Sequence, residues 1–270
     1  MVKKLFKHEF AALGRLVLPV LCAILGTGLL TRFVFLFDDG SVYFNIVGWS
    51  SVAMMCITII IGVVLAHIFA VVRFYRNLFS CEGYLSFTLP VTPAQHLFVK
   101  SVTAVVFQIA TVITAILSAS VALVGEPLVE VVKAGVYIFG KVFEVVDPGQ
   151  FTALAFEYLL IMITGYFVSL FTIYTCICLG QLAKKNRIVW SVAAYFGYYV
   201  ITQIVGTVFT VAGTALSFVL PMEEIAGFIE AHPYITAHTL GIGSIVLNLV
   251  LLTVYAVVCN FIMRKKLNLE

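Results

Sequence analysis

Long apolar runs dominate the chain, and short stretches that hold charged residues, prolines and glycines separate them. A helix of about 20 mainly apolar residues crosses about 30 Å of hydrocarbon. Membrane strands would alternate in polarity over only about 10 residues, whereas these runs are long and continuous. Helices also satisfy their backbone hydrogen bonds internally. The pattern predicts an all-α integral membrane protein, one transmembrane domain over 1–270, with six spans at roughly 13–36, 45–72, 99–123, 151–179, 188–220 and 239–263.

Two amphipathic helices are predicted outside the spans. Apolar residues before the first span share one helical stripe, which is typical of a short helix lying in the membrane interface. Between the third and fourth spans, apolar residues in 126–150 recur at steps of three or four. We expect an amphipathic helix on the outer membrane surface there, and a gate or lid over a substrate path is the alternative. The two stripes consist of Leu5, Phe6, Phe10 and Leu13, and of Leu128, Val132, Val136, Phe139, Phe143 and Val146.

Composition agrees with a membrane protein. Hydrophobic residues make up 62% of the 270 and charged residues 11%, and the mean hydropathy is +1.12. Soluble domains average roughly 45–50% apolar and about 25% charged residues. These values exclude an ordinary water-soluble domain.

The basic residues orient the predicted spans. With the amino terminus inside, three basic residues lie outside, namely Arg32, Lys133 and Lys141. The cytoplasmic side then holds Lys3, Lys4, Lys7, Arg15, Arg73, Arg76, Lys100, Lys184, Lys185, Arg187, Arg264, Lys265 and Lys266. By the positive-inside rule, both termini are predicted to be cytoplasmic. The net charge of +3 reflects this sidedness and does not indicate nucleic-acid binding.

Three patterns that resemble catalytic or binding signatures are incomplete. The run Gly135–Lys141 fits G-x-x-x-x-G-K, but Val142 follows where a phosphate-binding loop needs Ser or Thr. The acid pair Glu223 and Glu224 lacks the arginine that an intramembrane-protease signature would place after it. His238, near these acids, fits a solvated loop better than a metal site. We therefore predict no catalytic, cofactor or metal site in this chain.

A possible translocation path is marked by a few polar residues within the spans. Glu157 lies about two turns inside the fourth span, and acids within the membrane are functional candidates because their desolvation is costly. A position near the outer interface, where a glutamate is tolerated, is the equal alternative. The other candidates are Gln108, Gln203 and Asn248, which could line a polar path or tie helices together.

The loop between the second and third predicted spans, 73–98, is more elaborate than a simple connection. It carries charges, helix breakers and aromatic anchors together, which favours a segment held by another protein. The alternative is that it packs only against its own helix ends. The features are the charged Arg73, Arg76 and Glu82, the breakers Gly83, Pro90 and Pro93, and the aromatics Phe74, Tyr75, Phe79, Tyr84 and Phe87.

This loop resembles the first cytoplasmic loop of permease subunits of bacterial ABC-2-type transporters. The resemblance is carried by Phe74–Lys100, FYRNLFSCEGYLSFTLPVTPAQHLFVK, and more weakly by the opening KKLFKHEFAALGR and the tail RKKLNLE. The six-span layout fits as well. One departure is Cys81, where an acid commonly precedes the Glu-Gly pair.

The resemblance implies a non-catalytic permease subunit, in a bacterial cytoplasmic membrane, that works in pairs. A second copy or a related permease would complete the pair, and ATP and Mg would bind to separate cytosolic ATPase subunits. A coupling helix in the 73–98 loop would dock onto the ATPase. The implied docking residues are Arg76, Asn77, Phe79, Glu82, Tyr84, Leu85, Phe87 and Leu89.

Three other functions remain open from the sequence. A self-sufficient secondary transporter would use charged sites near the midplane and inverted repeats, but the halves show no sequence similarity. A membrane enzyme would need a water-activating group at depth. A sensor without transport activity could signal through the same ATPase-docking loop.

Overall fold

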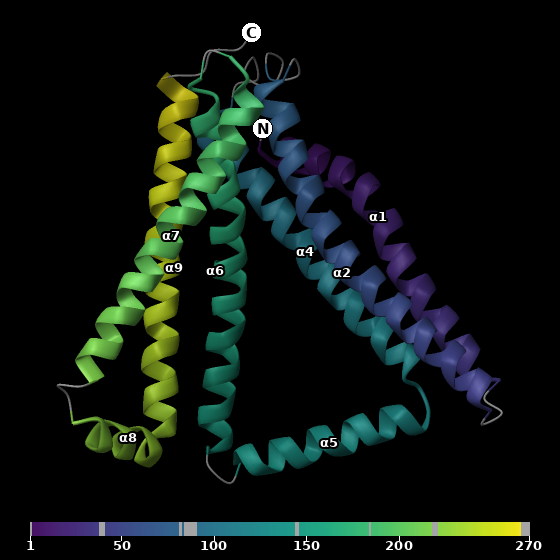
Figure 1. Ribbon diagram of the computed structural model, residues 1–270. Coiled ribbons are helices and arrows are strands. Elements are labelled where there is room, and N and C mark those ends of the chain that lie inside the picture. Colours follow the sequence, from purple (N-terminus) through teal and green to yellow (C-terminus); the bar gives the residue numbers. More distant parts are fainter. Residues whose placement is uncertain are drawn as a thin grey trace. The chain divides into compact units, whose positions relative to one another are not determined.

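The computed structural model describes residues 2–37, 41–80, 83, 91–143, 146–183, 185–217 and 221–265. Every regular element in these ranges is an α-helix (Figure 1). The helices are α1 (Val2–Phe35), α2 (Val42–Phe79), α4 (Pro93–Ala122), α5 (Glu126–Phe143), α6 (Pro148–Gly180), α7 (Arg187–Ser217), α8 (Met222–Ala231) and α9 (Pro233–Lys265).

Six of these helices are long and apolar enough to cross a membrane: α1, α2, α4, α6, α7 and α9. The structure thus confirms the predicted all-α class and the six long apolar helices, which are those of a multi-pass membrane protein. The remaining two helices are shorter, with 18 residues in α5 and 10 in α8. Of these, α8 was not predicted.

The amino terminus differs from the prediction. Instead of a short separate helix followed by a span, α1 is one helix of 34 residues that begins at Val2. No glycine or proline lies between Val2 and Leu13 to break it. Glu9 and Leu13, one turn apart, are both buried, so one packed face runs through the predicted junction and keeps the helix continuous.

The start of α4 follows the predicted helix breaker. Pro93 is the first residue of the helix, where its missing N–H costs no hydrogen bond. Thr92 caps this end, because its Oγ1 accepts from the N–H of Gln95 at 3.3 Å. The Gln95 side chain accepts in return from the N–H of Thr92 at 2.9 Å. This reciprocal capping box fixes where the helix after the 73–98 loop begins.

The chain divides into two compact units, 1–140 and 141–270. In the first, unit 1, α1 packs against both α2 and α4, and α2 also contacts α4 (Figure 1). Its core is formed by Leu13, Val17, Ala66 and Phe107, against which Leu21 and Phe69 pack.

Small residues let the helices of unit 1 approach closely, as is common between membrane helices. Ser118 of α4 donates to the carbonyl oxygen of Ile24 in α1 at 2.7 Å. This contact is possible because Gly28 leaves room: a Cβ there would lie 2.3 Å from Ser118 Oγ and 2.6 Å from the Ser118 carbonyl oxygen. Beyond it, the Arg32 side chain donates to the carbonyl of Val124.

The second unit, unit 2, is built around α6. This helix packs against α9 and against α7 (Figure 1). At one end, Gly180 of α6 approaches Ser191 of α7 so closely that a Cβ would lie 2.0 Å from the hydroxyl. Farther along, every described side chain of α7 from Tyr199 to Leu216 is exposed. Lipid or another protein must cover this apolar surface in a membrane.

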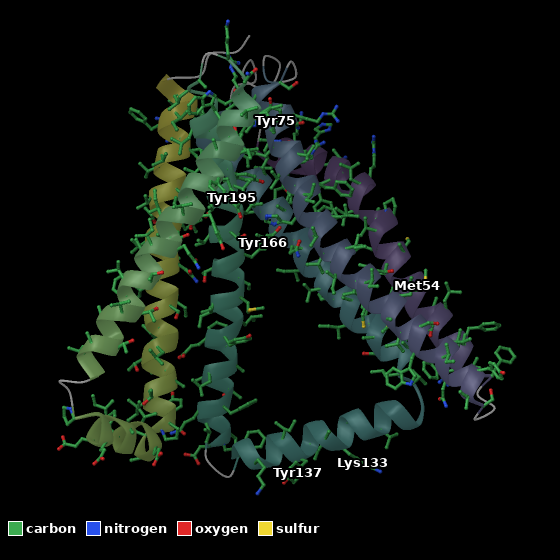
Figure 2. The ribbon with its side chains drawn as sticks, viewed as in Figure 1. Met54, Tyr75, Lys133, Tyr137, Tyr166 and Tyr195 are labelled. Carbon is green, nitrogen blue, oxygen red and sulfur yellow. The ribbon has the colours of Figure 1, made fainter. Side chains whose placement is uncertain are left out.

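Helix α5 links the predicted third and fourth spans. It covers Glu126–Phe143, so this part of 126–150 is helical as predicted. Lys133 and Tyr137 project from it (Figure 2). Its Phe143 ring packs against Phe151 of α6 at 5.1 Å between ring centroids. Its predicted place on the outer membrane surface stays a prediction.

The contact at Gly28 generates a first prediction. Gly28→Ala should lower the free energy of unfolding by about 1–3 kcal/mol, because the added methyl group meets the α4 backbone and α1 must shift away. Thermal unfolding of the purified chain in detergent measures this. Gly26→Ala is the matched control, since a Cβ at Gly26 meets nothing within 4 Å. Equal melting temperatures for the two variants would contradict the close approach.

Candidate functional site

One buried carboxylate joins three helices at one end of unit 1. Glu9 Oε2 accepts from Nε of Arg73 at 2.7 Å, and Oε1 accepts from Nζ of Lys100 at 2.6 Å. The amide of Asn77 also donates to Oε1, at 3.2 Å. Glu9 comes from α1, Arg73 and Asn77 from α2, and Lys100 from α4. We call these four residues the Glu9 cluster.

The cluster lies inside the helix ends, with Glu9 and Lys100 buried and Arg73 and Asn77 half-buried. Glu9 follows the start of α1 by about two turns, Arg73 precedes the end of α2 by nearly as much, and Lys100 follows the start of α4 by about two turns. Both Glu9 and Lys100 are only 6% exposed. Charges at such depth are tolerated only when paired and hydrogen-bonded. The pairing of Glu9 with Lys100 therefore fixes α1 and α4 relative to each other, and the bond from Arg73 to Glu9 does the same for α1 and α2.

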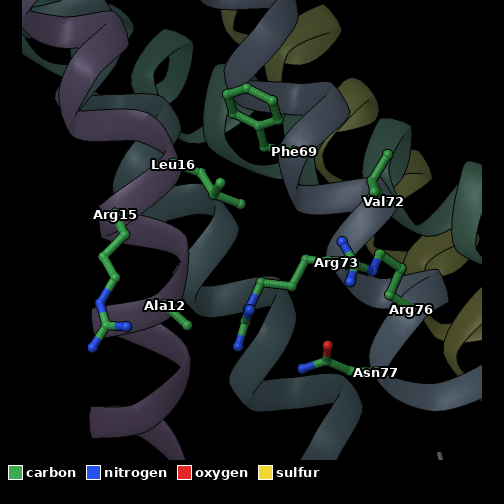
Figure 3. Close-up of a pocket in the computed structure, with 8 residues that line it drawn as sticks. All are labelled: Ala12, Arg15, Leu16, Phe69, Val72, Arg73, Arg76 and Asn77. Carbon is green, nitrogen blue, oxygen red and sulfur yellow. The ribbon is translucent and has the colours of Figure 1, made fainter. Parts of the chain in front are cut away.

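The cluster borders a cavity of about 310 Å³ between α1 and α2 (Figure 3). Arg73 and Asn77 line it on one side together with Arg76, and Arg15 of α1 lines it on the other. Basic groups from two helices thus face one space. No acidic side chain is among the described residues that line it.

The predicted docking residues are only partly described. Arg76 and Asn77 lie in the last turn of α2 and line the cavity. Phe79, the last residue of α2, is buried and packs against Phe74 and Tyr75 of the same helix, at ring-centroid distances of 5.6 and 6.5 Å. The other predicted docking residues, Glu82, Tyr84, Leu85, Phe87 and Leu89, lie outside the described residues.

Two of the predicted path residues lie together at the contact of α6 and α9 in unit 2. The carboxylate of Glu157 contacts Nδ1 of His238. About two turns along α6, Thr164 Oγ1 accepts from the amide of Asn248 at 3.2 Å. Gly241 gives Glu157 its space, since a Cβ there would lie 2.9 Å from Oε2. A carboxylate, an imidazole and an amide therefore share one helix interface.

The other two path residues do not join this group. Gln203 is exposed on α7. Gln108 lies in α4 of unit 1, half-buried, and its Oε1 accepts no hydrogen bond from the described residues. Of the four, Glu157 and Asn248 thus share the α6–α9 interface about two turns apart, and Gln108 and Gln203 lie on other helices.

The histidines and acids of the described residues are spread over several helices. No three His, Cys, Asp or Glu side chains among those residues are placed to hold a metal ion. His238, considered with the acids of the outer loop, instead contacts Glu157 and stacks on Tyr234, with 5.5 Å between ring centroids.

Neither Glu9 nor the contact between Glu157 and His238 was predicted from the sequence. Glu9 is the acid within a segment that carries Lys3, Lys4, Lys7 and Arg15. Lys100 sits at the start of an apolar run. A charged side chain on an apolar helix face needs a partner of opposite charge. The presence of one acid and one base on such faces was the available signal that Glu9 and Lys100 pair. The missing information was which helices are neighbours.

No protein-family model matches the chain, and neither a curated protein nor a solved structure matches it. Membership of the ABC-2-type permeases is therefore proposed below from the resemblance alone.

The Glu9 cluster generates a second prediction. Glu9→Gln should lower the free energy of unfolding by about 3–5 kcal/mol, because it leaves Arg73 and Lys100 without their buried counter-charge. Chemical unfolding in detergent micelles measures the loss. The control is Glu224→Gln, which removes an exposed acid on α8 and should change little.

A double substitution separates charge from packing in this cluster. Adding Lys100→Met to Glu9→Gln removes the buried cation as well and should restore part of the lost stability. Equal effects of Glu9→Gln and Glu224→Gln would show that the ion pairs do not hold unit 1 together.

Proposed function

We propose that this chain is the membrane-spanning permease subunit of an ATP-driven ABC transporter of the bacterial cytoplasmic membrane, working as an exporter. Both termini face the cytoplasm in this proposal, as the thirteen basic residues on one side favour. Two such subunits, identical or related, surround the path, and two cytosolic ATPases bind ATP and Mg. The resemblance of Phe74–Lys100 and the six long apolar helices support it.

The observation that carries the proposal is the position of the Glu9 cluster relative to the resembling segment. The segment leaves α2 after Phe79 and enters α4 at Pro93. Just inside both of these ends, Arg73 and Lys100 bind the same carboxylate, which belongs to α1. A partner that pushes on the segment would therefore act on three helices together instead of bending a loop.

This arrangement fits a passive coupling element. Binding of ATP would bring the two ATPases together and move both docking segments, and the three tied helices of each permease would follow. A ligand shifts such an equilibrium only by its differential affinity for the two states. The chain itself supplies no ATP chemistry in this mechanism.

A second function is favoured by the contact between Glu157 and His238. A carboxylate beside an imidazole, about two and a half turns inside α6, is the kind of group that couples proton movement to transport in secondary transporters. Gradient-driven uptake into liposomes without any ATPase, lost in Glu157→Gln, would establish this function in place of the first.

Co-purification tests the proposed permease. The tagged chain, expressed in its native host and extracted in gentle detergent, should retain an ATPase. Phe87→Ala should reduce the retained ATPase activity at least tenfold, because aromatic anchors dominate binding at interfaces. Phe87 is a sharper choice than Phe79, whose side chain is buried within unit 1.

The matched control is Phe98→Ala, which removes an exposed phenylalanine from α4. It should leave the retained activity unchanged. ATP hydrolysis by the purified chain alone, or full ATPase retention by Phe87→Ala, would overturn the proposal.

A further inference from the structure

The cavity between α1 and α2 changes from basic to apolar along the helices. These helices are antiparallel, because Glu9 pairs with Arg73 while Thr31 Oγ1 bonds to the carbonyl of Ser51 at 3.2 Å. Leu16 and Phe69 therefore lie deeper in the span than the basic groups. The cavity has a charged end at the helix termini and an apolar end toward the middle of the helices.

Two guanidinium groups define the charged end. In Figure 3 the groups of Arg15 and Arg73 lie on opposite sides of the small Ala12 side chain. Arg73 uses Nε for Glu9, and its two Nη nitrogens bond to no other described residue. Arg15 is exposed and pairs with no described carboxylate. Donors therefore remain available on both sides of the cavity.

We propose that this cavity binds a phosphate group, with Arg15 and the Nη nitrogens of Arg73 as donors. Planar guanidinium groups match phosphate oxygens in pairs, which gives stronger and more directional bonds than single charges do. Glu9 holds Arg73 in place through Nε, so one donor is positioned before the ligand arrives. At about 310 Å³, the cavity falls in the usual range of small-molecule sites, roughly 300–1,000 Å³.

The apolar end of the cavity favours an anionic phospholipid, whose headgroup would supply the phosphate, over a free phosphate ion. Leu16 and Phe69, with Val72, continue from the guanidinium groups toward the middle of the helices (Figure 3). A lipid in the leaflet at this end would place its phosphate at the arginines and the start of its acyl chain on these side chains. A free phosphate ion would leave the apolar end unused. This inference does not depend on the proposed transport function.

Equilibrium binding of phosphatidylglycerol to the purified chain in detergent, counted by native mass spectrometry, tests the inference. The wild type should bind the lipid saturably and in preference to phosphatidylcholine. Arg15→Gln should weaken binding about tenfold, as expected for the loss of one charge-assisted contact. Ala12→Leu, which fills the space between the guanidinium groups without changing charge, should weaken it as well.

The matched control is Lys7→Gln, which removes the same charge from an exposed site on α1 outside the cavity. It should bind within about twofold of the wild type, since diffuse surface charge contributes little in salt. Equal losses in Arg15→Gln and Lys7→Gln, or no saturable binding, would overturn the site. Saturable binding of inorganic phosphate without lipid binding would keep the phosphate site and overturn the lipid source.

Discussion

The described part of unit 1 depends on one constraint: a buried carboxylate cannot remain without counter-charges, and Glu9 finds them on two other helices. Apolar packing alone would allow α1, α2 and α4 to slide or rotate, because lipid tails are as apolar as the helix faces and provide no hydrophobic drive between them. The bonds from Arg73, Asn77 and Lys100 each have a required distance and direction. They therefore set the register of the three helices, while the Gly28 and Ser118 contact fixes their approach farther along.

The positions of the helices could be predicted from the sequence, whereas the side-chain pairs between helices could not. Hydropathy placed the six long helices to within several residues at most ends, because each must satisfy its own backbone and cross the same thickness. Pro93, recognised in the sequence as a helix breaker, is the first residue of α4. By contrast, the neighbours of Glu9 lie 64 and 91 positions away, and no local pattern encodes such a pairing. The same limit applies to Glu157, whose contact with His238 joins two helices that are separated by α7 and α8 along the chain.

The two units use polar residues in different ways. In unit 1 a single carboxylate gathers cations from two helices at one end of the bundle. In unit 2 the described polar contacts between helices are spread along their length and gather no charges: Glu157 contacts His238, Asn248 bonds to Thr164, Thr175 to Cys259, and Tyr255 to Tyr198 at 3.3 Å. The Glu9 cluster would make the ends of α1, α2 and α4 move as one body. It lies next to the segment that resembles a docking loop. The arginine cavity beside it adds a place where lipid could act on the same helices.

Glu9 holds the ends of α1, α2 and α4 together as one body, and its loss should loosen all three. Hydrogen–deuterium exchange with mass spectrometry measures this directly, because it reports local opening segment by segment. Comparing the wild type with Glu9→Gln, the account predicts faster exchange at all three ends together, around residues 5–12, 70–79 and 93–100, with unit 2 unchanged. Faster exchange confined to the start of α1, or no change at any of the three ends, would contradict it.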